Sequence, residues 1–237
     1  MEQFQIDALR QLLDNRGRRL RFPDPLEGEF QEDYNQRYHG HMIISGLLGV
    51  LAILSCGIID PFWMPDQARD LWQIRLTTAI PVLVILIFSK SRLAMNHMQP
   101  IVAFCACLFV ACVVGLSLKS ISPFNYFYAG SITMVMLVVF VLTRLQFVWG
   151  CISAAVMMVI VNVGYGVIGH ADLQMMTAVN FVAFSSALFS LIGTFLMERG
   201  LRQNYLQSRL LAFENHDLGE ANLRLQYLTA IDGLTQI

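Results

Sequence analysis

The sequence predicts an all-α membrane protein, a six-transmembrane-helix bundle with a C-terminal cytoplasmic coiled-coil helix. Of its 237 residues, 56% are hydrophobic and only 14% are charged, whereas a soluble globular domain carries roughly 25% charged residues. The shortage of charge is concentrated between Met42 and Met197, and both flanks are ordinary charged sequence. The apolar runs do not alternate with polar residues, which excludes a membrane β-barrel.

Six segments are long and apolar enough to cross a bilayer, which takes about 20 residues of helix. They are roughly Met42–Ile59, Leu71–Phe88, Met98–Leu118, Asn125–Thr143, Phe147–Ile168 and Met175–Met197. Because the connections between them are short, we expect neighbours in sequence to be antiparallel neighbours in space.

Lysine and arginine predict the orientation, because loops rich in these residues stay on the cytoplasmic side. Basic residues flank the whole block and mark its second and fourth connections: Arg10, Arg16, Arg18, Arg19, Arg21, Arg37, Lys90, Arg92, Arg144, Arg199, Arg202, Arg209 and Arg224. The other connections hold Asp60, Asp66, Asp70 and Asp172, against only Arg69 and Lys119. We therefore expect both termini to be cytoplasmic and the outer face to be acidic.

The chain divides into four parts. Residues 1–41 are a cytoplasmic N-terminal amphipathic segment, in which Phe4, Leu9 and Leu12 follow helical spacing. Residues 42–197 form the six-helix transmembrane sensor or anchor domain, residues 198–229 a coiled-coil signalling helix, and residues 230–237 the start of a further domain.

A heptad repeat predicts that the signalling helix dimerises. Leucine recurs every seventh residue at Leu211, Leu218 and Leu225. Asn215 and Asn222 each follow a leucine by four residues. Leucine at heptad position d with asparagine at position a favours a parallel, in-register dimer at some cost in stability. The alternative is an amphipathic helix that packs on its own domain.

The end of the chain resembles the entry to a GGDEF domain, the catalytic domain of diguanylate cyclases. That entry usually reads Asp-x-Leu-Thr-Gly after a coiled-coil helix, and here Asp232, Leu234 and Thr235 match it while Gln236 replaces the glycine. The resemblance implies the membrane sensory, regulatory and dimerisation region of an enzyme that makes cyclic di-GMP from two GTP. The catalytic residues and the GTP and Mg²⁺ sites are absent from these 237 residues, so we expect a longer parent enzyme.

The membrane block is similar to the six-span anchors of some bacterial diguanylate cyclases and class III adenylyl cyclases. The similarity lies in Arg21-Phe22-Pro23, Leu26-Glu27, Phe30 and Ile74-Arg75-Leu76. It implies a multi-pass protein of the bacterial inner membrane. The expected partners are a second copy of the chain, the lipid bilayer and an unidentified signal ligand, with no nucleic acid.

Arg75 is a charged residue inside the second span. A charge at that depth usually has a partner, and Asp60 at the end of the first span is the first candidate, with Asp172 as another. The group is either a structural ion pair or part of an outer-facing pocket for an anionic ligand.

Histidines at the inner membrane level suggest a cofactor. His39 and His41 lie at the inner end of the first span, and His97 lies at the inner end of the third. Neutral imidazole binds haem iron, so these residues predict a non-covalent haem b in a redox or gas sensor. The alternative is a set of ordinary interfacial histidines. Since His39 and His41 point about 200° apart on a helix, only one can face a given pocket. The five cysteines lie in apolar runs without CxxC spacing, and the sequence gives no firm metal site.

Other classes of protein remain as alternatives. The sensor region of a histidine kinase, or of an adenylyl cyclase-like receptor, would also combine six spans with a coiled coil. A transporter or channel would need charges or broken helices at mid-bilayer, and this chain has one arginine near the end of a span.

Overall fold

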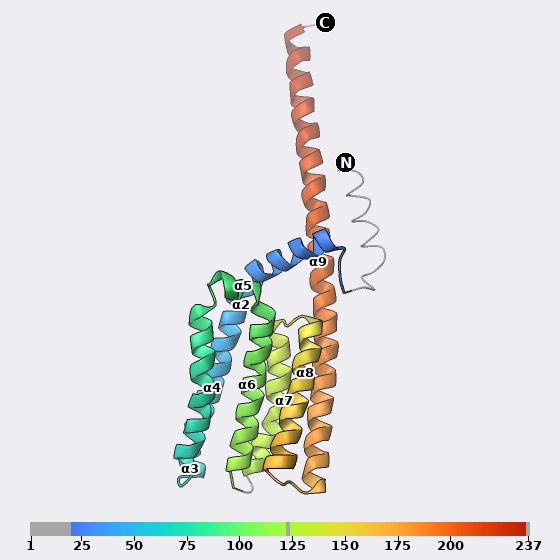
Figure 1. The fold of residues 1–237 in the computed structure, drawn as a ribbon. Helices are drawn as coiled ribbons and strands as arrows, with labels where there is room; N and C mark the ends of the chain where they lie inside the picture. Colours follow the sequence, from blue (N-terminus) through green and yellow to red (C-terminus); the bar gives the residue numbers. More distant parts are fainter. Residues whose placement is uncertain (1–19, 122–123, 236–237) are drawn as a thin grey trace. The chain divides into compact units, whose positions relative to one another are not determined.

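The computed structural model describes residues 20–121 and 124–235, and every regular element in these residues is a helix. The elements are α2 (Asp24–Cys56), α3 (Asp60–Trp63), α4 (Ala68–Phe88), α5 (Arg92–Asn96), α6 (Met98–Lys119), α7 (Phe124–Thr143), α8 (Phe147–Asn162), the π-helix η1 (Val163–Ile168) and α9 (Leu173–Thr235). Six of the described helical segments are long and apolar enough to cross a membrane. The predicted all-α fold class is confirmed (Figure 1).

The described residues form two units, Gln31–Glu198 and a unit that combines residues 20–30 with 199–235. We call them the bundle unit and the terminal unit, and each is described by itself. Most of the predicted amphipathic segment, including Phe4, Leu9 and Leu12, lies outside the described residues.

Helices α2 and α9 are longer than the apolar runs from which the first and last spans were predicted. Helix α2 begins at Asp24, so the predicted boundary between residues 41 and 42 falls inside a continuous helix. Pro25 follows Asp24 in the first turn, where a missing N–H costs nothing, and Asp24 and Glu27 suit the positive end of the helix dipole. Helix α9 likewise continues unbroken to Thr235.

Helix α6 is the centre of the bundle unit. It contributes to two apolar clusters, one shared mainly with α7, α8 and α9 and the other with α2, α4 and α7. Val110 and Val113 serve the first cluster, and Phe109 and Leu116 serve the second. A helix that is apolar on every side belongs inside a bundle, which explains why α6 runs between the other spans (Figure 1).

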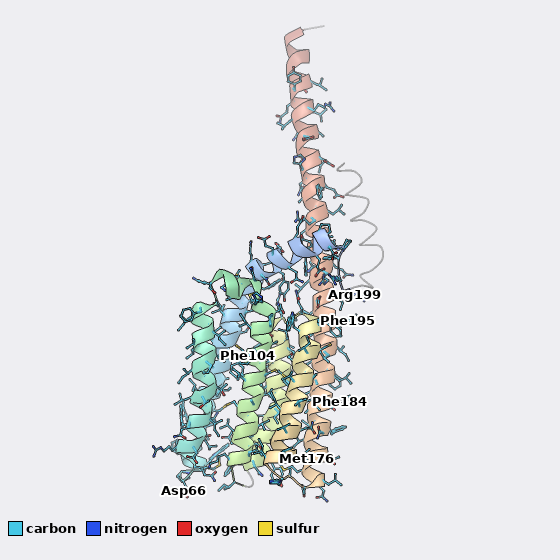
Figure 2. All side chains as sticks on the ribbon, viewed as in Figure 1. Asp66, Phe104, Met176, Phe184, Phe195 and Arg199 are labelled. Atoms are coloured by element: carbon cyan, nitrogen blue, oxygen red, sulfur yellow. The ribbon has the colours of Figure 1, made fainter. Side chains whose placement is uncertain are left out.

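Large apolar side chains cover the outside of the bundle unit. Phe184 on α9, labelled in Figure 2, is 61% exposed, and Phe189 and Ile87 are exposed in the same way. In a soluble protein such a surface would be an aggregation hazard. Here it is the surface expected of helices that face lipid.

One end of the bundle unit is held together by hydrogen bonds from α2. We call it the basic end, because Lys90 and Arg144 lie in its connections. The Tyr34 hydroxyl donates to the carbonyl oxygen of Arg144. The Asn35 amide donates to the carbonyl oxygen of Met95 at 3.1 Å. These bonds connect α2 with the chain segments that join α7 to α8 and α4 to α6.

Several polar groups within the spans are paired between neighbouring helices, which suits an apolar solvent. Asn162 and Asn180 exchange two amide hydrogen bonds of 2.9 and 3.1 Å between α8 and α9. The Ser45 hydroxyl donates to the carbonyl oxygen of Leu142 in α7 at 2.9 Å. Such bonds between neighbouring helices favour one packing arrangement over others.

The π-helix at the end of span five permits a close helix contact. A Cβ atom added to Gly164 would lie 2.3 Å from a methyl carbon of Val114 on α6. Val114 is β-branched and stiff, so the space could open only if the two helices moved apart.

We therefore predict that Gly164→Ala lowers the thermal stability of the protein in detergent by about 1–3 kcal/mol, the usual cost of overpacking. Gly130→Ala is the matched control, because no atom lies within 4 Å of the added carbon. This control should leave stability unchanged or raise it by up to about 1 kcal/mol, since alanine favours helices. Equal melting temperatures for the two variants would contradict the close contact.

Candidate functional site

Arg75 is buried in the bundle unit at the end opposite the basic end. Its guanidinium forms a bidentate ion pair with Asp60, in which Nε and Nη2 donate to the two carboxylate oxygens at 3.0 Å each. Nη1 donates to the carbonyl oxygen of Ile53 at 2.7 Å, and Nη2 also donates to the Tyr128 hydroxyl at 3.1 Å. Tyr128 in turn donates to Asp60 at 2.6 Å. We call Asp60, Arg75 and Tyr128 the arginine network.

The arginine network, together with the Ile53 carbonyl oxygen that it contacts, joins four helices. Ile53 belongs to α2, Asp60 to α3, Arg75 to α4 and Tyr128 to α7. Arg75 and Asp60 are each only 1% exposed. Gly57 leaves room for the arginine, because a Cβ atom there would lie 3.0 Å from Arg75 Cδ. The network therefore fixes the relative positions of these helices where they converge.

The same geometry argues against an anionic ligand on Arg75. Four hydrogen bonds already occupy a group with five N–H donors. The charge is neutralised by Asp60. Asp172 is not a partner of Arg75, because its carboxylate accepts the backbone N–H of Met175 at 3.0 Å and caps α9. The structure places Arg75 in an ion pair with Asp60, and a ligand role for this group stays a prediction.

A large cavity of about 1060 Å³ lies beside the arginine network, lined by α2, α4, α6 and α7. Arg75 and Tyr128 line it at one end, and His39, Ser89 and His97 line it at the basic end. Its wall on α7 runs from Phe127 to Thr143, which corresponds to about 24 Å at the helical rise of 1.5 Å per residue. The cavity thus spans most of the hydrocarbon thickness of a bilayer, about 30 Å.

The cavity opens sideways out of the bundle. Phe104 on α6, labelled in Figure 2, lines the cavity and yet is 56% exposed. Met134 and Val138 on α7 also line it and are 70% and 44% exposed. In a membrane this side of the bundle would face lipid.

Two of the three predicted haem histidines line this cavity. His39 and His97 are lining residues and His41 is not, in keeping with the opposite directions of neighbouring imidazoles on a helix. The Nε2 atom of His39 lies 3.1 Å from the carbonyl oxygen of Ser89. Among the described residues no group of three or more His, Cys, Asp or Glu side chains could hold a metal ion. Haem binding stays a prediction.

The terminal unit contains a second, largely buried ion pair, which connects the start of α2 with α9. Arg202 donates to both carboxylate oxygens of Glu27 at 2.7 and 3.0 Å. The rings of Phe22 and Phe30 lie 5.0 and 4.5 Å from the guanidinium carbon of Arg202. Tyr205 packs against Phe30 at a centroid distance of 5.3 Å. We call Phe22, Glu27, Phe30, Arg202 and Tyr205 the clamp.

The predicted dimer residues lie on the exposed part of α9. Leu211, Leu218 and Leu225 are 57%, 67% and 63% exposed, and Asn215 and Asn222 are exposed as well. Asp232, Leu234 and Thr235 lie in the last turns of α9, where the resemblance implies a separate entry turn. Gly233 is itself helical, so it does not end α9 as a left-handed C-terminal glycine would.

The six apolar helices make this chain a multi-pass membrane protein. The MASE8 family model matches residues 58–212, more than half of the chain, so the chain belongs to the MASE8 family. MASE8 is a family of membrane-associated sensory domains. A search of curated proteins and a search of solved structures each returned no match. The matched range includes the arginine network and the α9 side of the clamp, while His39 lies before it.

Sequence reasoning missed the cavity, the clamp and the role of Tyr128. The sequence does carry one signal for the clamp, a basic residue one turn past the last span and an acidic residue before the first. Their pairing across 175 residues is not readable from spacing. Tyr128 looks like one more interfacial aromatic residue until the fold brings it to Asp60.

The arginine network predicts a large stability loss when Asp60 is changed to asparagine. Removal of one partner from a buried ion pair leaves an uncompensated charge and costs about 3–5 kcal/mol. Asp70→Asn is the matched control, because Asp70 pairs with Lys119 at 2.9 Å in a pair that is about half exposed. That variant should cost at most about 1 kcal/mol. Thermal unfolding in detergent measures both, and a similar small loss in each would contradict the structural role of the network.

Proposed function

We propose that this chain is the membrane sensory and dimerisation region of a diguanylate cyclase that makes cyclic di-GMP from two GTP. Membership of a membrane-associated sensory family supports the sensory part. The observation that carries the cyclase part is the Asp232-x-Leu234-Thr235 pattern at the end of a helix that leaves the last span. In this proposal the GTP and Mg²⁺ sites belong to a catalytic domain of the same polypeptide, and this chain supplies no catalytic residue.

The proposal places the protein in the bacterial inner membrane with both termini in the cytoplasm. The distribution of lysine and arginine supports this orientation. The basic end of the bundle unit, with Lys90 and Arg144, would then face the cytoplasm.

A parallel homodimer suits the chemistry of the proposed enzyme. Two GTP molecules must be joined, so two catalytic domains must face each other with one nucleotide each. The exposed leucines Leu211, Leu218 and Leu225 supply one apolar position per heptad on α9. Asn215 and Asn222 at the alternate core positions would favour the parallel, in-register pairing.

Helix α9 is the route by which a membrane signal would reach the catalytic domains. It is one uninterrupted helix from Leu173 to Thr235, and it contains both the sixth membrane span and the heptad repeat. The clamp attaches α9, through Arg202, to Glu27 at the start of α2. A change in the packing of α2 would thus act on α9, and two packings of a weak coiled coil differ by only a few kcal/mol.

The helical phase of α9 should control cyclase output in the full-length parent protein. Two residues inserted after Glu220 rotate everything beyond by about 200°, which turns the downstream heptad leucine away from the interface. Seven inserted residues restore the phase. We expect the two-residue insertion to change cyclic di-GMP production at least tenfold and the seven-residue insertion to leave it near the original level.

Production is measured as cyclic di-GMP formed from GTP by membranes that contain each protein. Equal output from both insertions would contradict transmission through helix phase. No cyclic di-GMP from any version, with phosphorylated histidine formed from ATP instead, would contradict the cyclase and favour a histidine kinase.

The clamp should affect output more than a neighbouring surface pair does. Glu27→Gln removes the charge that faces Arg202, whose side chain is 7% exposed. Glu29→Gln is the matched control, because Glu29 pairs with Arg209 in a pair that is roughly half exposed. We expect Glu27→Gln to shift cyclic di-GMP production severalfold and Glu29→Gln to change it less than twofold. Identical output from the two variants would remove the clamp from the signalling route.

A further inference from the structure

We propose that the cavity of the bundle unit binds an acyl-chain lipid with an acidic head group, which enters sideways from the bilayer. This inference extends the sensory function proposed above. Lipid binding itself does not depend on that function, but the role of the lipid as a signal does.

The shape of the cavity suits a long chain. Its volume of about 1060 Å³ is at the upper end of ordinary ligand sites. Its wall on α7, from Phe127 to Thr143, is about 24 Å long. A compact ligand would occupy only part of this length, whereas an extended alkyl chain can follow all of it.

The chemistry of the walls also favours an alkyl chain. Three hydroxyl side chains of the cavity wall already donate to backbone carbonyl oxygens: Ser45 to Leu142, Ser131 to Tyr128 and Thr143 to Val139. At the far end Arg75 is neutralised by Asp60. A ligand therefore meets apolar surface along most of the cavity and finds no unpaired charge at that end.

The basic end of the cavity lies where a lipid head group would be. Ser89, Ser91 and His97 line the cavity there, and His39 contacts the carbonyl oxygen of Ser89. Lys90, between the two serines, is exposed. A lipid keeps its head group at the membrane surface, and a cation at that level attracts an anionic head group.

The lateral opening gives such a lipid a way in. Phe104, Met134 and Val138 belong to the cavity wall and are also exposed on the outside of the bundle. The molecules available at that surface of a membrane protein are lipids. The head group could be the carboxylate of a fatty acid or the phosphate of a phospholipid, and the mass of the bound molecule distinguishes these sources.

Native mass spectrometry of the full chain, purified in mild detergent from bacterial membranes, tests the proposal. We expect a co-purified lipid of defined mass in wild type. Ala52→Trp and Ser131→Phe fill the cavity from α2 and α7, and each should lower lipid occupancy at least tenfold. Ala155→Trp is the control, because Ala155 is exposed on α8 and does not line the cavity. It should retain the lipid.

A photoactivatable oleate analogue with a diazirine in its chain tests the head group. It should label α2 and α7 peptides in wild type, and Lys90→Ala should reduce its labelling severalfold. The matching monoacylglycerol analogue, which has no charge, should label wild type and Lys90→Ala equally.

Several outcomes would overturn the proposal. No bound lipid in wild type, or equal loss of lipid in Ala155→Trp, would mean that the cavity has no specific lipid. A Soret band from about one haem per protomer would assign the cavity to haem. Unchanged lipid in Ala52→Trp together with loss of a dimer would assign it to a protein interface. Lipid binding is measured without any assay of cyclase activity. A negative result for lipid binding therefore leaves the proposed cyclase function untouched, and the reverse also holds.

Discussion

The ion pair between Arg75 and Asp60 is the interaction on which the rest of the bundle depends. A guanidinium in an apolar environment must be neutralised and its donors must be satisfied, since an isolated charge there costs many kcal/mol. Asp60, Tyr128 and the carbonyl oxygen of Ile53 meet these demands together. In doing so they determine how α2, α3, α4 and α7 meet at one end, and hence where the wall of the cavity begins.

Several features followed from the sequence because they depend on local composition. The six spans are apolar runs of bilayer length, and the partner of Arg75 lies 15 residues away at the end of the preceding span. An intramembrane arginine needs an anionic partner, and Asp60 was the first of the two candidates that the sequence offered. The exposed heptad leucines of α9 are visible for the same reason, since their period of seven is written in the chain itself.

The features that escaped the sequence depend on packing between distant segments. The cavity results from side-chain volumes on four helices, and no single helix carries its pattern. The clamp joins Glu27 to Arg202 across 175 residues. Asp172 had the right charge and the right end of the bundle to meet Arg75, yet its carboxylate accepts the backbone N–H of Met175 and caps α9. The start of α2 was missed because a polar helix can continue into an apolar one without any break in the sequence.

A membrane sensor must convert an event in the bilayer into a change outside it. In this chain, α2 lines the cavity with its membrane part and contributes Glu27 to the clamp with its first turn. Helix α9 receives the clamp at Arg202 and carries the heptads beyond it. Both helices therefore take part in membrane packing and in the segment that would drive dimer geometry, and the sensory family of the chain fits that arrangement.

Disulfide crosslinking in isolated membranes tests the central claim, that α9 pairs in parallel with a second copy. Leu218→Cys is placed at a core heptad position, and Glu220→Cys is placed two residues on, at the position farthest from the interface. With an oxidant, the account predicts abundant covalent dimers for Leu218→Cys, and for Glu220→Cys no more than the wild-type chain gives from its own cysteines. Equal crosslinking at both positions, or more at Glu220→Cys, would contradict the parallel dimer and with it the proposed route from membrane to catalytic domain.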